Sequence, residues 1–198
     1  MSDMVTAIES KAGISVRRIS VDDYHRMGEA GIFARGERVE LLDGMLIAMP
    51  PVGERHIYSV LALEHLLPLM LGERAIVSTQ NPLRLSASSE PEPDIVLLEA
   101  PVTRYDGHAP VTADAALVIE VAETSRAYDR GPKLRAYQDA GVREIWIIDL
   151  VKEVVEMWRR SEASEYELTS LAGRGDRIAP AAFPDIVIAV DDILPRRG

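Results

Sequence analysis

The chain has 198 residues, of which 47% are hydrophobic, so it is long enough to bury a full core without disulfides or a structural metal. It contains no cysteine, which excludes a disulfide framework, thiolate metal sites and thiol catalysis. The net charge of −10 argues against non-specific binding of nucleic acid, because that binding depends on Lys and Arg contacts with phosphates. Oxygen and imidazole ligands remain available, and they favour hard cations such as magnesium or manganese.

The sequence predicts one cytoplasmic domain and no membrane partner. No apolar run approaches the roughly 20 residues that cross a bilayer, and the first residues lack the pattern of a signal peptide. We expect a loose lead-in over residues 1–19, a single domain over residues 20–194 and a frayed polar tail over residues 195–198.

The first half of the domain predicts a helix, a hairpin and a second helix. Ser20 and Asp23 match a capping box that opens a short helix, which stops near Gly31. Apolar arms on both sides of Asp43-Gly44 predict a hairpin. Helical spacing then covers residues 56–71, where Pro68 is expected to kink or shorten the last turn, and strands follow at residues 75–79 and 83–85.

The second half predicts a strand–helix–strand unit on a central sheet. Residues 95–98 and 117–121 are short apolar runs typical of strands buried on both faces, and a surface loop joins them. A helix over residues 128–140 precedes another buried strand at residues 145–148, which predicts a βαβ-like crossover. The remaining predicted strands, the last two of them more peripheral, are residues 154–158, 166–170 and 186–190.

Two carboxylates stand on or beside the buried strands of this unit. Asp94 lies at the start of one apolar run and Glu120 lies in the middle of the next. If the two strands are neighbours, both carboxylates can reach one divalent cation, which can polarise a phosphate and lower the pKa of a bound water. The alternatives are that Asp94 caps a turn after Pro93 and that Glu120 pairs with an arginine. Burial of an ionised Glu120 without any partner is costly, so a partner is required.

Lys133 is the third candidate of the site. It lies four residues after Asp129 and four before Tyr137, so these side chains share one helical stripe. Its ammonium could orient or deprotonate an attacking water, or stabilise charge on a phosphoryl transition state. The alternative is an ordinary Asp-Lys pair on the surface. Arg126 and Arg130 nearby are candidate phosphate-binding residues, and a solvated helix end is equally consistent with them.

Further candidates come from outside the central stretch. Glu40 on the hairpin is a weaker candidate for the metal, or an exposed strand residue. His56 at a helix start and Gln80 at a strand end are supporting candidates, as is Tyr137, although a lone histidine at a helix start is more often structural.

Five segments carry a resemblance to a known family: P-D at residues 93–94, I-E-V at 119–121, D-R-x-x-K at 129–133, Y-Q-D-A-G-V at 137–142 and E-I-W-I-I-D at 144–149. Together they resemble the Uma-type restriction endonuclease family of the PD-(D/E)xK nuclease superfamily. Residues 38–51, His56 and residues 80–85 look similar too, so the resemblance covers about residues 20–190.

The resemblance implies a restriction-endonuclease-like fold, which is an α/β architecture with a mixed central sheet flanked by helices. It also implies hydrolysis of phosphodiester bonds with Mg²⁺ or Mn²⁺ as cofactor. By position, Asp94 is the aspartate of the P-D element and Glu120 is the acid of the (D/E)xK element. The chain departs from that pattern at the lysine, because Ala122 stands two residues after Glu120. In the family the following helix supplies the lysine, which here is Lys133.

The leading hypothesis is therefore a metal-dependent DNA endonuclease that acts as a homodimer, since nucleases that cut both strands usually pair. One alternative is a non-catalytic or regulatory module that kept the fold and uses its acidic surface for protein partners. Another is a metal-dependent hydrolase of small nucleotides or single strands.

Overall fold

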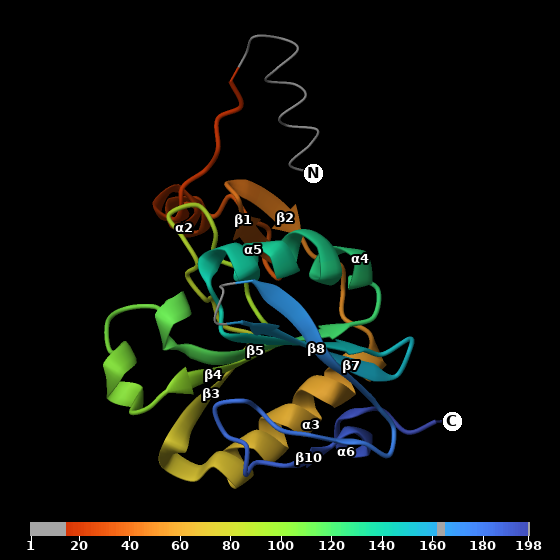
Figure 1. The fold of residues 1–198 in the computed structure, drawn as a ribbon. Helices are drawn as coiled ribbons and strands as arrows, with labels where there is room; N and C mark the ends of the chain where they lie inside the picture. The colour runs from red at the N-terminus through yellow and green to blue at the C-terminus, as the bar shows by residue number, and fades with distance from the viewer. Residues whose placement is uncertain (1–14, 162–164, 198) are drawn as a thin grey trace.

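The computed structural model describes residues 15–161 and 165–197 and consists of a central sheet between two helical layers. Figure 1 shows α4 (Arg126–Tyr128) and α5 (Leu134–Ala140) over one face of this sheet. On the opposite face lie α3 (Glu54–Leu71) and α6 (Val190–Ile193). The mixed α/β fold with helices on both faces of a central sheet confirms the predicted fold class.

The central sheet has six strands in the order β3-β4-β5-β6-β7-β8, and only the β5–β6 pair is parallel. The parallel pair is joined by α4 and α5, so the predicted crossover from strand through helix to strand is confirmed. The strands are β3 (Ala75–Thr79), β4 (Ile95–Glu99), β5 (Ala115–Ala122), β6 (Glu144–Asp149), β7 (Val154–Arg160) and β8 (Tyr166–Gly173).

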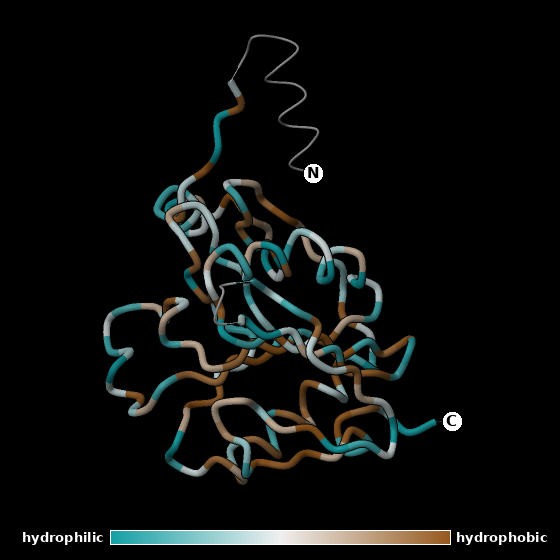
Figure 2. Tube along the Cα trace, in the orientation of Figure 1, coloured by the Kyte–Doolittle hydropathy of each residue, from teal (hydrophilic) through white to brown (hydrophobic). Residues whose placement is uncertain are grey.

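Hydrophobic side chains fill both faces of this sheet. One cluster packs between the sheet and α3, and includes Leu63, Leu67, Leu97, Ile119 and Trp146. The other packs between the sheet and α5 and is built on Val118, Leu134, Tyr137 and Ile147. Figure 2 shows the hydrophobic segments running through the central strands and the hydrophilic ones mainly in outer loops. The continuous apolar runs of β4, β5 and β6 follow from this burial on two sides.

The N-terminal segment confirms two local predictions. Helix α2 (Val21–Glu29) begins after Ser20, whose Oγ accepts a hydrogen bond of 3.1 Å from the Asp23 N–H. Strands β1 (Val39–Leu42) and β2 (Met45–Ala48) form the predicted hairpin. Asp43 and Gly44 have φ values of 50° and 71°, as a two-residue turn of this type requires, and a Cβ on Gly44 would collide with Arg18.

Helix α3 begins two residues before the predicted start and continues through Pro68 to Leu71, so its last turn is not shortened. Pro68 is exposed, and Gly72 ends the helix with a positive φ of 58°. The short 3₁₀ segments among the described residues are η1 (Gly72–Arg74), η2 (Val102–Tyr105) and η3 (Thr112–Asp114).

Two predicted elements differ from the structure. Residues 83–85 are not a strand, because their N–H groups bond to the carbonyls of Pro91, Pro110 and Ser89 within the surrounding loops. The helix predicted over residues 128–140 is divided by a π-helical turn, η4 (Asp129–Lys133), which contains Pro132. Proline has no N–H and clashes with the preceding turn, so the regular α-helical hydrogen bonding is interrupted there.

The C-terminal segment forms the small antiparallel pair β9 (Arg177–Ile178) and β10 (Ile188–Ala189), followed by α6. The lead-in expected over residues 1–19 lies outside the described residues as far as residue 14, as does residue 198 of the expected tail. Arg197 of that tail pairs with Glu153 at 2.6 Å. Within residues 15–161 and 165–197, no helix is long and apolar enough to span a bilayer.

Candidate active site

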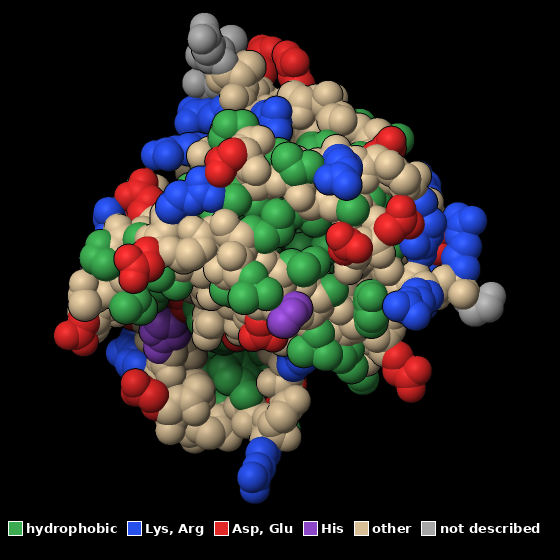
Figure 3. All heavy atoms as spheres, turned by 90° about the horizontal axis from the view of Figure 1, so that it is seen from below, with side chains coloured by type: hydrophobic (Ala, Val, Ile, Leu, Met, Phe, Trp, Pro, Cys, Tyr) green, Lys and Arg blue, Asp and Glu red, His purple; other side chains and the backbone are tan. Residues whose placement is uncertain are grey.

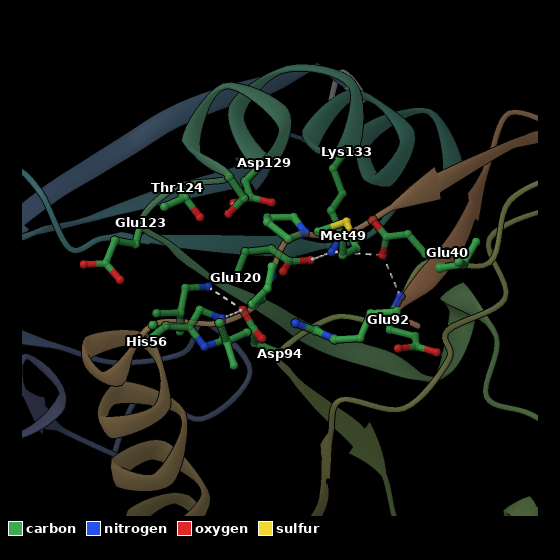
Figure 4. A pocket seen from close by; sticks show the side chains of 18 residues that line it. Glu40, Met49, His56, Glu92, Asp94, Glu120, Glu123, Thr124, Asp129 and Lys133 are labelled. Atoms are coloured by element: carbon green, nitrogen blue, oxygen red, sulfur yellow. Dashed lines mark hydrogen bonds and ion pairs between the residues drawn. The ribbon is translucent and has the colours of Figure 1, made fainter. Parts of the chain in front are cut away.

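Asp94 and Glu120 come together because their strands are antiparallel neighbours. Ile95 of β4 faces Ile119 of β5, so the residues next to them, Asp94 and Glu120, occupy the next facing positions at the end of this pair. Both side chains are buried, with exposed fractions of 6% and 3%. In Figure 4 the two carboxylates lie next to each other in the middle of the pocket.

Asp94 is held from three directions. Its Oδ2 accepts hydrogen bonds from Val121 N–H at 2.9 Å and from His56 Nε2 at 3.1 Å, while its Oδ1 accepts one from Gln80 Nε2 at 3.2 Å. Burial opposes ionisation of Asp94, but His56, Lys133 and the Val121 N–H outweigh burial and lower the pKa of this carboxyl. Asp94 is therefore an oriented carboxylate, and the supporting candidates His56 and Gln80 both contact it.

Glu120 has one engaged oxygen and one open oxygen. Its Oε1 accepts a hydrogen bond of 2.5 Å from the Tyr137 hydroxyl and lies 3.0 Å from Lys133 Nζ. Its Oε2 accepts no hydrogen bond within the part of the chain that the structure describes. Burial raises the pKa of Glu120 to about 8, Asp94 and Asp129 add to this rise, and Lys133 opposes it.

Lys133 is buried at 2% exposure between two carboxylates. Its Nζ lies 3.0 Å from Glu120 Oε1 and 3.3 Å from Glu40 Oε2. Burial alone would lower the pKa of this ammonium, but Glu120, Glu40 and Asp129 together raise it well above its ordinary value. Lys133 is therefore a permanently protonated group, and the alternative of a surface Asp-Lys pair is excluded by its burial.

Glu40 reaches the site from β1 and is occupied by protein donors. Its Oε1 accepts a hydrogen bond of 2.6 Å from Tyr128, and its Oε2 accepts one of 3.0 Å from Glu92 N–H besides the contact with Lys133. Both oxygens of Glu40 thus hold the lysine and its surroundings, and the weaker assignment of Glu40 to the metal stays a prediction. The alternative of an exposed strand residue is wrong, because Glu40 is 2% exposed.

The π-helical turn η4 presents a further acid to the pocket. Asp129 is buried at 3% exposure and accepts a hydrogen bond of 2.5 Å from Ser125 Oγ. Burial raises the pKa of Asp129 to about 6, while Lys133 and Ser125 oppose the rise. The turn therefore places Asp129 and Lys133 on the inner side of the same segment, as their predicted shared stripe requires.

The resulting pocket has an excess of negative charge. Six carboxylates line it together with only two permanently cationic side chains, Arg38 and Lys133. The hairpin end and the start of α3 form its rim, while Lys133 enters from the helix above the sheet (Figure 4). The lining carboxylates are Glu40, Glu92, Asp94, Glu120, Glu123 and Asp129. Such a concentration of buried negative charge favours a bound cation.

Sequence reasoning missed several of these residues. Asp129 was recognisable only as a neighbour of Lys133 on the helix, and Glu92 precedes the Pro93-Asp94 element by one residue. Arg38 precedes the hairpin strand that carries Glu40, and no pattern distinguishes it from a surface arginine. Tyr128 begins the predicted helix, and its hydrogen bond with Glu40 joins segments too distant in sequence for any local signal.

Arg126 and Arg130 do not line the pocket. Both guanidinium groups bond to the buried Asp149 at the end of β6, and Arg130 also bonds to Glu156 of β7 at 3.0 Å. In the structure these arginines form an ion-pair cluster that ties the crossover helix to the sheet, and their phosphate-binding role stays a prediction.

Arg130→Ala is expected to lower the free energy of unfolding by about 2 kcal/mol, because it leaves Glu156 and part of the buried Asp149 unpaired. The matched control is Arg135→Ala, an exposed arginine of α5, which should change stability by less than about 0.5 kcal/mol. Urea unfolding measures both. A variant of normal stability with weakened DNA binding would instead support the phosphate-binding role.

Glu120→Gln is expected to raise the melting temperature of the metal-free protein, because it removes one negative charge from a buried acidic cluster. The effect should depend on pH. Folding raises the pKa of Glu120 from 4.5 to about 8. The stability that this raised pKa contributes is therefore fully present below pH 4.5 and is lost as the pH rises through about 8.

Melting curves in EDTA at pH 5 and pH 8 check this expectation. The melting temperature of Glu120→Gln should exceed that of the wild type by more at pH 8 than at pH 5. A difference that shrinks with rising pH would contradict the assigned protonation of Glu120.

The fold is shared with a solved protein of low sequence similarity. A crystal structure from Anabaena variabilis ATCC 29413, described as "a putative nuclease belonging to DUF820", superposes with a TM-score of 0.66 at 14% identity. The match covers 88% of this chain and 97% of the other. At this identity the match shows the fold. A comparison with curated proteins finds no match.

The family is shown by a second comparison. The model of the Uma2 family, described as "Putative restriction endonuclease", matches residues 21–191, which includes every candidate residue of the pocket. The resemblance inferred from the P-D and I-E-V segments is thereby confirmed. The chain belongs to the Uma2 family of restriction-endonuclease-like nucleases.

Proposed function

We propose that this protein is a divalent-metal-dependent endonuclease that hydrolyses phosphodiester bonds in DNA. Membership of the Uma2 family supports a nuclease. The observation that carries the finer proposal is the meeting of Asp94, Glu120 and Lys133 in one buried acidic pocket. Two carboxylates on neighbouring strands with an ammonium beside them suit hydrolysis of a phosphate ester.

The donor set fits a hard divalent cation. Asp94 and Glu120 would hold it, since one oxygen of Glu120 is open and the Asp94 carboxylate is kept ionised by its hydrogen bonds. Carboxylate oxygens with water are the ligands of Mg²⁺ and Mn²⁺. No three His, Asp or Glu side chains within residues 15–161 and 165–197 are arranged around one metal position, so water or backbone oxygens would complete the set.

A bound cation of this kind supplies polarisation of the phosphate and a lowered pKa of water. Lys133 supplies positive charge that does not depend on pH in the ordinary range, because its pKa is raised well above 10.5. A protonated ammonium cannot act as a base, so Lys133 orients the attacking water or stabilises negative charge on the phosphoryl group.

The surrounding residues position these groups. Tyr137 donates to Glu120 and fixes its carboxylate, while His56 and Gln80 fix Asp94. Glu40 keeps Lys133 on its side of the pocket. Apart from the exposed Gln80, the side chains that make these contacts are buried, so the site is organised before substrate arrives.

Arg38 is the cation at the pocket that best suits a substrate phosphate. It lines the pocket, is partly exposed and forms no ion pair with any described residue. With a net charge of −10, the protein offers DNA few such contacts. We therefore expect weak DNA binding with a shallow salt dependence, because few phosphate contacts release few counterions, and we further propose that the enzyme acts in the cytoplasm as a homodimer.

The burial of the site favours a substrate that is thinner than a DNA duplex. Asp94, Glu120 and Lys133 are exposed by only 2% to 6%, and residues 49–53 line the same pocket. A splayed single strand reaches such a recess more easily than a stacked duplex does, so single-stranded DNA is the second candidate substrate.

Incubation of the purified protein with supercoiled plasmid, single-stranded DNA and RNA tests the proposal. We expect cleavage of DNA in Mg²⁺ or Mn²⁺ and none in EDTA. Cleavage only of the single strand would select the second candidate, and cleavage undiminished in EDTA would overturn the metal dependence. Failure to cut any substrate would favour a non-catalytic module.

A further inference from the structure

Hydrolysis in the pocket releases a proton from the attacking water. A positioned side chain whose pKa lies near the operating pH accelerates this proton transfer. Lys133 cannot take the proton, because its raised pKa keeps the ammonium protonated. Asp94 and Glu120 would be bound to the cation. The candidates for the proton acceptor are therefore the other acids that line the pocket.

Asp129 has a free carboxylate oxygen at the pocket. It lies on η4, four residues before Lys133, and Figure 4 shows it on the turn above Glu120. Its Oδ2 accepts the hydrogen bond of 2.5 Å from Ser125 Oγ. Its Oδ1 accepts no hydrogen bond from a described residue, yet it is not one of the described oxygens that are sealed from solvent without a partner. A water molecule in the pocket can therefore donate to this oxygen.

The other acids of the pocket are less suited to accept the proton. Both oxygens of Glu40 already accept hydrogen bonds from protein donors. Glu123 pairs with Arg55 at 3.5 Å. The carboxylate of Glu92 lies on the far side of the pocket from Asp129 (Figure 4). Asp129 therefore remains as the acid with an open oxygen on the side of Lys133.

Asp129 is not placed as a third ligand to a cation on Asp94 and Glu120. Among residues 15–161 and 165–197, no three His, Asp or Glu side chains surround one cation position. An acid that stands beside a cation site without joining it can accept a proton from a water that is held there. Its position thus suits proton transfer better than metal binding.

We propose that Asp129 is the general base of the reaction and that its Oδ1 takes the proton from the water that attacks the phosphate. As the water oxygen forms its bond to phosphorus, one O–H bond breaks and the proton passes to Asp129. The bond from phosphorus to the leaving sugar oxygen breaks, and that oxygen takes a proton from solvent. Asp129 returns its proton to solvent, so one water is consumed and a phosphate monoester and a hydroxyl group are formed. This role rests on the proposed nuclease function.

The charges around Asp129 suit a base that works at neutral pH. Burial raises its pKa to about 6, and Asp94 and Glu40 add to this rise, while Lys133 and the Ser125 hydrogen bond oppose it. A divalent cation in the pocket would lower this pKa further. The carboxylate is therefore ionised at pH 7, and cleavage should slow as the pH falls through the pKa of Asp129.

The gathering of acids distinguishes the pocket from the outer surface. On the face where α3 and α6 lie, Figure 3 shows acidic side chains standing apart among basic and hydrophobic ones. The pocket instead collects six carboxylates, and Glu120 also faces Asp129, since each of the two acids lies close enough to act on its neighbour's charge. Neighbouring carboxylates of this kind make Asp129 a better proton acceptor than an isolated surface aspartate.

The rate of plasmid nicking in saturating Mg²⁺ tests this role in Asp129→Asn. Asparagine keeps an oxygen for the Ser125 hydroxyl but cannot take up a proton. We expect kcat to fall by about a hundredfold to ten-thousandfold, with KM, Mn²⁺ binding and the urea midpoint retained. Asp139→Asn is the matched control, because Asp139 is exposed on α5 and does not line the pocket, and it should leave the rate unchanged.

Two further readouts separate a base from a residue that only supports the fold. Between pH 7 and pH 5, kcat of the wild type should fall by more than kcat of Asp129→Asn does. In Asp129→Ala, which removes the carboxylate, added formate should restore cleavage in proportion to its concentration without stimulating the wild type. A folded Asp129→Ala that formate does not rescue would overturn the role, and Asp129→Asn tests it even if the alanine variant fails to fold.

The remaining outcomes distinguish this role from the nuclease function. If the wild type cuts DNA and Asp129→Asn cuts within about tenfold of its rate, Asp129 is not the base, while the nuclease function stands. Loss of Mn²⁺ binding in Asp129→Asn would make Asp129 a cation ligand and would likewise overturn the role. A wild type that cuts no substrate would overturn the nuclease function and the base together.

Discussion

Replacing Lys133 with methionine is expected to lower the free energy of unfolding by about 3–5 kcal/mol and to abolish phosphodiester cleavage. The side chain is 2% exposed, and its ammonium contacts both Glu40 and Glu120. Methionine has a similar length but no charge, so it leaves two buried carboxylates without their cation. Chemical denaturation measures the first effect and plasmid cleavage measures the second.

Lys152→Met is the matched control, because Lys152 is exposed in the turn before β7 and forms no ion pair with any residue in the described ranges. It should change stability by less than about 0.5 kcal/mol. The double variant Glu40→Gln/Lys133→Met should be less unstable than the sum of the two single variants, by about 0.5–3 kcal/mol. If the effects of the two single variants on the free energy of unfolding were additive, the contact of Lys133 with Glu40 would contribute nothing to stability.

Glu120→Gln is expected to reduce cleavage by about a hundredfold to a thousandfold while the protein stays folded. Glutamine retains the hydrogen bond to Tyr137 but presents no negative oxygen to a cation. Asp94→Asn should have a similar effect, since its carboxylate is oriented by His56 and Val121. The measurement is the rate of plasmid nicking in saturating Mg²⁺.

Glu99→Gln is the control for both acid variants. Glu99 ends β4, is half-buried and pairs with Arg104 at the opposite end of the strand from Asp94. Its substitution should leave the nicking rate unchanged. If Glu120→Gln cut as fast as Glu99→Gln, Glu120 would have no part in the reaction.

The two buried strands that carry the acids could be predicted from the sequence, because Pro93 and residues 101–114 bound apolar runs. That these strands are neighbours was a condition of the metal hypothesis, and the antiparallel pairing of β4 with β5 meets it. The burial of Glu120 within such a run indicated that it must have a partner. Local patterns carry this information because the burial of a strand on both faces shows in the residues of that strand.

The contacts of Lys133 could not be predicted in the same way. Its position was inferred from the resemblance to the family, whereas its contact with Glu40 joins the hairpin to the crossover helix. The π-helical turn that contains Pro132 also lies where the sequence predicted one regular helix. Long-range pairing and an irregular turn therefore set the geometry that the sequence left open.

The sequence could not show which carboxylates pair with the arginines near the site. Arg126 and Arg130 formed the densest basic group near the site, but Asp149 and Glu156 on β6 and β7 neutralise them. Whether a surface cation is free depends on which distant carboxylates the fold brings to it. That dependence also explains why Arg38, which lies at the pocket where its charge acts on Glu92, was not recognisable.

Binding of Mn²⁺ to the wild type, Asp94→Asn and Glu120→Gln, followed by electron paramagnetic resonance, tests most directly whether Asp94 and Glu120 hold a divalent cation. The wild type is predicted to bind at least one Mn²⁺ per chain, and a crystal soaked in Mn²⁺ should place it against both carboxylates. Each variant should lose that binding. Equal Mn²⁺ binding by the wild type and Glu120→Gln, or a metal that contacts neither acid, would contradict the proposed site.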